Sequence, residues 1–251
     1  MRATSDIPCW DAYLDHGIRL MEGRYLHGPH AGRRWLSEAR KVFAECAAQE
    51  EEYDIQTLAH FRLAQCVYYL GDRKTAAEWM ALGHDRIQSA GTPLSPHAHA
   101  TCLLLEGTVL EIMGLIDEAL EVATRAWKIA ALVPLVLGSP ESHRLSGNIT
   151  YRLGHLYMEH GRQLGLRRKK ALRESYDWFL TACRYFSLLS DPTIEDHRAH
   201  AAACGYAGTT AQLLSGYGYV VARVYLRHAE KLLASHAPML DIEAAYWWNR
   251  A

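Results

Sequence analysis

Apolar residues recur along most of the chain at positions i, i+3, i+4 and i+7, which is the spacing of one face of an α-helix. Sustained alternation of apolar and polar residues, the pattern of a half-buried strand, does not occur. Short stretches rich in proline, glycine or serine, at 92–96, 138–140 and 190–192, interrupt the helical pattern as turns. The pattern therefore predicts an all-α fold.

A triplet of small, bulky and small residues recurs along the chain, with its members at positions i, i+4 and i+7. These offsets place the three side chains on one face of a helix, where the small residues let a second helix approach closely. The copies are Ala39, Phe43 and Cys46; Ala76, Met80 and Gly83; Ala119, Ala123 and Ala126; Ser175, Phe179 and Ala182; and Ala222, Leu226 and Ala229. Their recurrence predicts helices that pack in pairs.

Two further signals flank these triplets. Upstream lies a glycine or alanine, and seven residues after it comes a residue expected to end the helix, namely Gly71, Gly114, Gly161 or Ser215. Downstream lies a proline, which cannot continue the second helix; these are Pro93, Pro134, Pro192 and Pro238. The sequence therefore predicts where both helices of a pair end.

Together these signals resemble the tetratricopeptide repeat (TPR), most literally in Leu153-Gly154-x-x-Tyr157 and Leu70-Gly71-Asp72. The triplets lie farther apart than the family's period of about 34 residues, so the likeness is to a divergent relative. The resemblance implies one domain, 1–251, of about five antiparallel helix pairs stacked into a right-handed superhelix. The expected pairs are 7–50, 54–91, 96–133, 141–190 and 194–236, followed by a cap helix at 239–251.

In this family the first helix of each pair lines a concave groove. The resemblance places there a mixed wall of aromatic and polar side chains: Phe61, Gln65, Tyr68, Tyr69, Thr108, Glu111, Tyr151, His155, Met158, Glu159 and Gln212. Such a wall suits an extended or helical peptide of a partner protein. The alternative for Phe61 is burial between helix pairs.

The expected cap helix carries Tyr246, Trp247 and Trp248 near its end. These aromatic side chains either cover the apolar face of the last pair or form an exposed patch for self-association or partner docking. We therefore consider a homo-oligomer through this patch alongside a protein or peptide partner.

The chain carries few residues in patterns that indicate chemistry. His197, His200 and Cys204 stand at i, i+3 and i+7, so one helix face can present all three to a metal ion, although such spacings also arise by chance among 14 histidines. No nucleophile elbow GxSxG and no HExxH zinc motif occurs. We therefore expect no catalytic residues, no cofactor and no enzymatic activity.

The charge balance of 27 basic against 28 acidic residues argues against a general nucleic-acid binder, which needs a cationic surface. The exception is a local basic segment, which comprises Arg162, Arg167, Arg168, Lys169, Lys170 and Arg173. The segment is either a solvated insertion or a docking patch for an acidic protein surface or a nucleic-acid phosphate.

Two features bear on the compartment. The start of the chain shows no signal-peptide pattern, and the longest apolar stretch, 129–138, is far shorter than the roughly 20 residues that cross a bilayer. The six cysteines are scattered without a CxxC motif, which is typical of small core residues. The sequence therefore predicts a cytoplasmic protein without a membrane span.

These observations favour a non-catalytic scaffold or adaptor that binds a partner protein or peptide in the concave groove. Two alternatives stay open. One is a regulatory protein that senses a peptide or a small ligand, and the other is nucleic-acid binding through the basic segment at 162–173.

Overall fold

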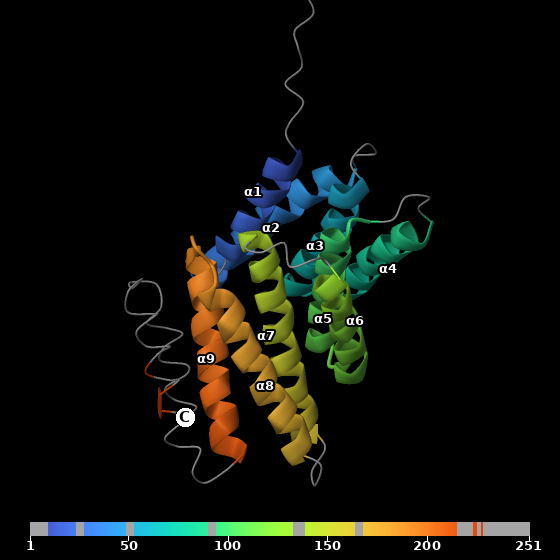
Figure 1. Ribbon diagram of the computed structural model, residues 1–251. Helices are drawn as coiled ribbons and strands as arrows, with labels where there is room; N and C mark the ends of the chain where they lie inside the picture. The colour runs from blue at the N-terminus through green and yellow to red at the C-terminus, as the bar shows by residue number, and fades with distance from the viewer. Residues whose placement is uncertain are drawn as a thin grey trace, which may run out of the picture. The chain divides into compact units, whose positions relative to one another are not determined.

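The computed structural model describes residues 10–23, 28–48, 53–89, 94–132, 139–163 and 168–214, with 223–224 and 227. These residues form α-helices and turns, and no strand occurs among them, which confirms the all-α prediction for this part of the chain (Figure 1). The helices are α1 (Trp10–Gly23), α2 (Gly28–Ala47), α3 (Tyr53–Tyr69), α4 (Arg73–Ser89), α5 (Pro96–Ile112), α6 (Ile116–Leu132), α7 (Pro140–Gln163), α8 (Arg168–Ser187) and α9 (Ile194–Leu214). None of these helices is both long and apolar enough to cross a membrane.

Several predicted features lie outside the described residues. They are the last triplet (Ala222, Leu226 and Ala229), the helix end at Ser215, the prolines Pro93, Pro134 and Pro238, the cap helix at 239–251 with Tyr246, Trp247 and Trp248, and Arg167 of the basic segment. These features stay predictions.

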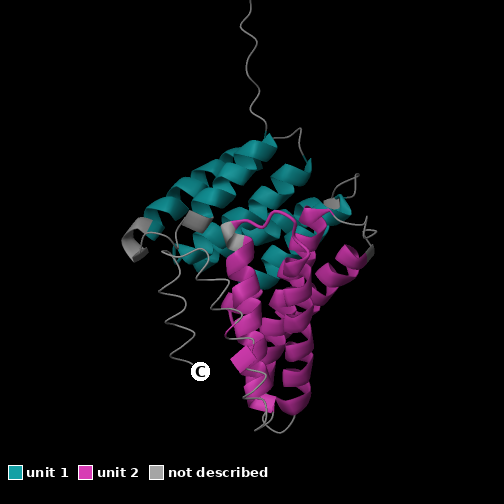
Figure 2. Ribbon diagram, turned by 60° about the vertical axis from the view of Figure 1, so that its left-hand side comes forward, with its two compact units in different colours: residues 1–109 teal, residues 110–251 magenta. Residues whose placement is uncertain are grey.

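The chain divides into two compact units, Met1–Val109 and Leu110–Ala251, and helix α5 crosses the boundary (Figure 2). In the first unit, α1 packs on α2, α2 on α3 and α3 on α4, and α1 also touches α3. In the second unit, α6 packs on α7, α7 on α8 and α8 on α9, and α7 also touches α9. In each unit, then, one helix (α1 or α7) contacts both the next helix and the one after it.

The predicted triplets lie at the contacts between helices. All members of the triplets that begin at Ala39, Ala119 and Ser175 are completely buried. Opposite two of the central phenylalanines lies a glycine of the preceding helix: a Cβ on Gly17 would lie 2.6 Å from the ring of Phe43, and one on Gly154 would lie 2.8 Å from the ring of Phe179. The glycine of the preceding helix therefore gives the ring the space in which it packs.

Glycine ends two of the helices through the same turn. Gly71 and Gly114 have φ angles of +100° and +84°, a region that L-residues with a side chain rarely adopt. Gly71 donates its N–H to the carbonyl of Tyr68, and Asp72 donates to Val67, which is the Schellman pattern; Gly114 and the residue after it repeat the pattern. Asp72 then begins the next helix, because its carboxylate accepts hydrogen bonds from the backbone and hydroxyl of Thr75.

The prediction that Gly161 ends its helix is wrong. Helix α7 continues through Gly161 to Gln163, and a Cβ on Gly161 would lie 3.2 Å from the Cβ of Ala171 in α8. This glycine therefore serves the close approach of α7 and α8 rather than the end of α7.

The start of α9 is fixed by a capping box and an ion pair. The hydroxyl of Thr193 accepts a hydrogen bond from the backbone N–H of Asp196, whose carboxylate accepts one from the backbone N–H of Thr193. The guanidinium of Arg144 in α7 donates to both oxygens of the same carboxylate, with its Nε 2.8 Å from Oδ1 and its Nη2 2.8 Å from Oδ2. Burial acts to raise the pKa of Asp196, but these hydrogen bonds outweigh it and lower the pKa. The pair therefore ties the first turn of α9 to α7.

Candidate functional site

The structure buries most of the groove residues predicted in the first unit. Phe61 is 1% exposed, and its ring lies where a Cβ on Gly83 would be 2.7 Å away. Thr108 is 4% exposed, and its hydroxyl donates a hydrogen bond to the carbonyl of Leu104 on the same helix. The prediction that Phe61 and Thr108 line an accessible groove is therefore corrected, because packing takes up both side chains.

Three further predicted groove residues of this unit lie on α3. Gln65 and Tyr68 are buried, and Tyr69 is half-buried. Tyr68 and Tyr69 make an edge-to-face ring contact, with ring centroids 6.3 Å apart. These residues therefore present little free surface in the first unit, and Tyr69 is the most accessible of them.

In the second unit the structure brings predicted groove residues together. Glu111, near the end of α5, accepts a hydrogen bond from Arg152 of α7. His155, less than one turn farther along α7, places its Nδ1 2.5 Å from the other carboxylate oxygen of Glu111. The side chains of Arg152 and His155 are 23% and 22% exposed, and that of Glu111 is 10% exposed. The carboxylate thus lies beneath two partly accessible nitrogen groups.

The neighbouring cations decide the ionisation of Glu111. Burial acts to raise its pKa, but the charge of Arg152 and the hydrogen bond and charge of His155 lower the pKa to about 2. Glu111 is therefore a carboxylate throughout the physiological range, and its role is that of a fixed negative charge rather than a proton donor.

An aromatic group adjoins this ion pair. Tyr206 of α9 meets the ring of His155 at 5.2 Å in an edge-to-face contact and stacks on Phe179 at 5.2 Å with an interplanar angle of 9°. Tyr151 of α7 lies 6.0 Å from Tyr206, measured between ring centroids. We call Glu111, Tyr151, Arg152, His155 and Tyr206 together the Glu111 cluster.

Sequence reasoning had not identified Arg152 and Tyr206. Arg152 lies one position beyond a predicted groove residue, and Tyr206 directly follows the small residue Gly205 of α9. Both join the cluster only because α7 packs against the end of α5 and against α9. The helical offset of three residues between Arg152 and His155, which puts both side chains on one face of α7, is the signal that could have found Arg152, whereas the sequence carries no such signal for Tyr206.

The remaining predicted groove residues lie in different surroundings. Met158 is 1% exposed and belongs to the core, which corrects its assignment to the groove wall. Glu159 is half-buried and pairs with Arg162 one turn on, at 2.5 Å. Gln212 is exposed on the last turn of α9.

A hollow of about 440 Å³ lies between α6 and α7. Its lining residues are Leu120, Glu121, Thr124, Arg125, Lys128, Tyr157 and His160. Tyr157, the last residue of the Leu-Gly-x-x-Tyr motif, is half-buried there, and burial raises its pKa. The volume falls in the range of small-molecule sites. Sequence reasoning had not identified this hollow, because its two walls come from different predicted pairs.

The basic segment is exposed where the structure describes it. Arg168, Lys169, Lys170 and Arg173 lie on the first turns of α8 with exposed side chains, and Arg162 is exposed near the end of α7. The charges therefore gather at a helix N-terminus, where the helix dipole disfavours cations.

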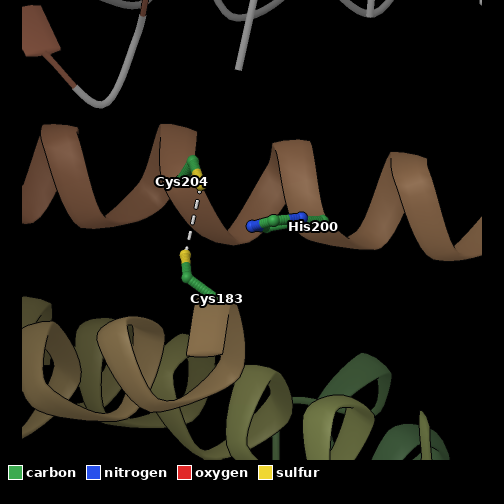
Figure 3. Close-up of side chains that lie close together, drawn as sticks. All are labelled: Cys183, His200 and Cys204. Atoms are coloured by element: carbon green, nitrogen blue, oxygen red, sulfur yellow. Dashed lines mark hydrogen bonds between the residues drawn. The ribbon is translucent and has the colours of Figure 1, made fainter. Parts of the chain in front are cut away.

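The group of possible metal ligands in the structure differs by one residue from the predicted group. His200 and Cys204 of α9 meet Cys183 of α8, and their ligand atoms lie within 4.8 Å of one another (Figure 3). The Sγ atoms of Cys183 and Cys204 are 3.2 Å apart, and the hydrogen bond between them, with burial, raises the pKa of Cys183. His197 is not a member of this group, which corrects the predicted set. The third ligand comes from the neighbouring helix rather than from the preceding turn of α9.

The comparisons with known proteins add no assignment. No protein-family model matches the chain, and no curated protein sequence is similar to it.

Proposed function

We propose that this chain is a non-catalytic, TPR-like interaction protein whose Glu111 cluster binds a segment of a partner protein. The observation that carries the proposal is the convergence of α5, α7 and α9 on this one cluster. In the resemblance drawn from the sequence, these are the first helices of successive pairs, which line the binding face of such a stack.

The residue types in the Glu111 cluster support the binding of a partner segment. Burying a carboxylate and a guanidinium carries a desolvation penalty that apolar side chains of similar volume avoid, so stability alone does not account for an ion pair at this position. Tyrosine and arginine are enriched among the residues that dominate binding energies. Because Arg152 neutralises the charge of Glu111, we expect the partner segment to be recognised by ring contacts and hydrogen bonds more than by net charge.

The test uses the full chain as bait and compares three single-residue variants. His155→Ala and Gln212→Ala remove groups from α7 and α9 near the predicted groove, and Arg184→Ala removes an exposed cation from α8 as the control. Proteins captured by the wild type would be identified by mass spectrometry, and their segments titrated by calorimetry.

The proposal expects both groove variants to weaken binding and the control to leave it unchanged, with a weak dependence on salt. Equal binding by all variants would show that the Glu111 cluster is not the binding site. Steep salt dependence together with loss of binding on charge reversal in the basic segment would assign binding to that segment instead.

The hollow between α6 and α7 favours a second candidate function, the sensing of a small ligand. Arg125 and Lys128 line the hollow together with Tyr157 and the acidic Glu121, and two cations with an aromatic ring suit a small anion with an apolar part. A thermal-shift screen of small carboxylates and phosphates would test this candidate. A stabilising compound should lose its effect in Lys128→Ala and keep it in Arg184→Ala, whereas equal shifts in both variants would exclude the hollow.

A further inference from the structure

We propose that Cys183, His200 and Cys204 bind a single Zn²⁺ ion that joins α8 to α9. This inference is independent of the proposed partner-binding function. Three potential ligands of two types converge here from two helices, and among the described residues this is the group in which the geometry brings metal ligands together.

The spacing of the ligand atoms fits a tetrahedral ion. With Zn–S bonds of about 2.3 Å and Zn–N bonds of about 2.0 Å, ligand atoms at tetrahedral angles lie about 3.5–3.8 Å apart. The two sulfurs stand at 3.2 Å, and all three ligand atoms lie within 4.8 Å of one another. Zinc binding therefore requires the two sulfurs to separate by about 0.5 Å and the imidazole to move toward them. Both changes are adjustments of side chains and need no movement of the helices.

Helix geometry explains why two ligands come from α9. His200 and Cys204 are four residues apart, so both side chains project from one face, and Figure 3 shows the sulfur of Cys204 directed at that of Cys183 with His200 beside it. Cys183 follows the triplet residue Ala182, which is completely buried where α8 packs. The packing that buries this triplet thus also brings the third ligand to α9.

The ligand types select the ion. Two thiolates and an imidazole favour zinc, whereas Mg²⁺ and Ca²⁺ require oxygen ligands. Three protein ligands leave one position of the tetrahedron for water or another small ligand. Cys204 is buried, but Cys183 and His200 are half-buried, so an ion can enter from solvent.

The surroundings are suited to holding the ion. The site borders a core cluster of Ala182, Phe186, Leu189 and Ala203, and the ring of Phe186 lies 6.2 Å from that of His200. An apolar border of this kind excludes water from one side of a charged centre and strengthens its bonds to the thiolates.

The alternative use of the cysteines is a disulfide. A disulfide has its sulfurs about 2.05 Å apart and needs no imidazole beside it. At 3.2 Å the sulfurs are not bonded, and the convergence of His200 is explained by the metal and not by the disulfide.

Binding has a definite stoichiometry. Two Cys thiols and one neutral imidazole take up one Zn²⁺, and the two thiol protons pass to the buffer. The experiment uses the full chain, reduced and stripped of metal by a chelator. Zn²⁺ is titrated in competition with a chromophoric chelator, proton release is followed in a weakly buffered solution, and Co²⁺ serves as the spectroscopic probe.

We expect one equivalent of Zn²⁺, the release of two protons, and an intense thiolate-to-cobalt absorption with the visible bands of a tetrahedral ion. Cys183→Ala and Cys204→Ala should each lower the affinity on the order of 100-fold. His197→Asn is the matched control, because it removes the neighbouring histidine of the same helix that lies outside the group, and it should bind as the wild type does.

Circular dichroism in the presence of chelator shows whether each variant keeps its helices. If a cysteine variant does not fold, His200→Gln provides an independent test that leaves both thiols in place. Failure of the reduced wild type to bind Zn²⁺, or equal binding by the wild type and the ligand variants, would overturn the proposal.

Discussion

Gly154 of α7 faces the ring of Phe179 of α8 so closely that a Cβ on the glycine would lie 2.8 Å from the ring atom Cδ1. Phe179 has no room to retreat, because it is completely buried and stacks on Tyr206. The hydroxyl of Ser175 also donates to the carbonyl of Gly154, at 2.8 Å, and so holds the two helix backbones close. The approach of α7 and α8 therefore depends on the missing side chain of this glycine.

Gly154→Ala should lower the free energy of unfolding by about 1–2 kcal/mol, because the clash with Phe179 exceeds the gain in helix propensity of up to about 1 kcal/mol. Urea denaturation of the wild type and variant measures the difference. In the double variant Gly154→Ala/Phe179→Leu the two effects should not add, since the smaller side chain relieves the clash. Strict additivity would show that the methyl group fits without displacing the ring.

Glu111→Gln should destabilise the protein at neutral pH and much less in acid. The pKa of Glu111 is about 2 in the folded chain, below its ordinary value of 4.5, so its contribution is fully present above pH 4.5 and is lost as the pH falls towards 2. The size of this contribution is about 3 kcal/mol at neutral pH. Urea denaturation at a series of pH values would show the wild-type and variant curves converging between these limits. Curves that stay parallel across this interval would contradict the assigned pKa.

Arg144→Ala should destabilise the chain by about 2–4 kcal/mol, because it leaves the buried carboxylate of Asp196 without its cation. Arg162→Ala, which breaks the more exposed pair with Glu159 on the same helix, should cost less than about 1 kcal/mol. Chemical denaturation gives both values. Hydrogen exchange at the first turn of α9 should accelerate in the first variant alone, and equal effects of the two substitutions would refute the role given to Arg144.

Charge reversal in the basic segment should stabilise the chain slightly. Lys169→Glu and Lys170→Glu replace a cation by an anion in the first turn of α8, where the helix dipole favours negative charge, and each should add about 0.3–1 kcal/mol at low salt. Arg184→Glu in the last turn of the same helix is the matched control and should act in the opposite direction. Thermal unfolding at two salt concentrations measures both, and a loss of stability on reversing Lys169 or Lys170 would show that the segment has a structural role.

The local features of the fold follow from the sequence alone. The i, i+3, i+4 period predicts the helices, the triplets that begin at Ala39 and Ser175 predict the buried faces, and Gly71 and Gly114 predict two of the helix ends. Each of these features depends on residues within one or two turns, so spacing in the sequence is sufficient. Gly161 is the exception, because a glycine that ends a helix and one that admits a neighbouring helix look the same in a sequence.

The candidate sites depend on which helix faces which. The sequence by itself placed His200 and Cys204 on one helix face and Glu111 and His155 among the groove residues. Only the tertiary structure added Cys183 from α8 and Arg152 and Tyr206 to these groups, and it buried Phe61 and Met158 in the core. The physical reason is that periodicity fixes the direction of a side chain relative to its own helix axis, whereas a binding site needs the rotation and offset of neighbouring helices. Those are decided by contacts such as Gly154 with Phe179 and Arg144 with Asp196, between residues 25 and 52 positions apart.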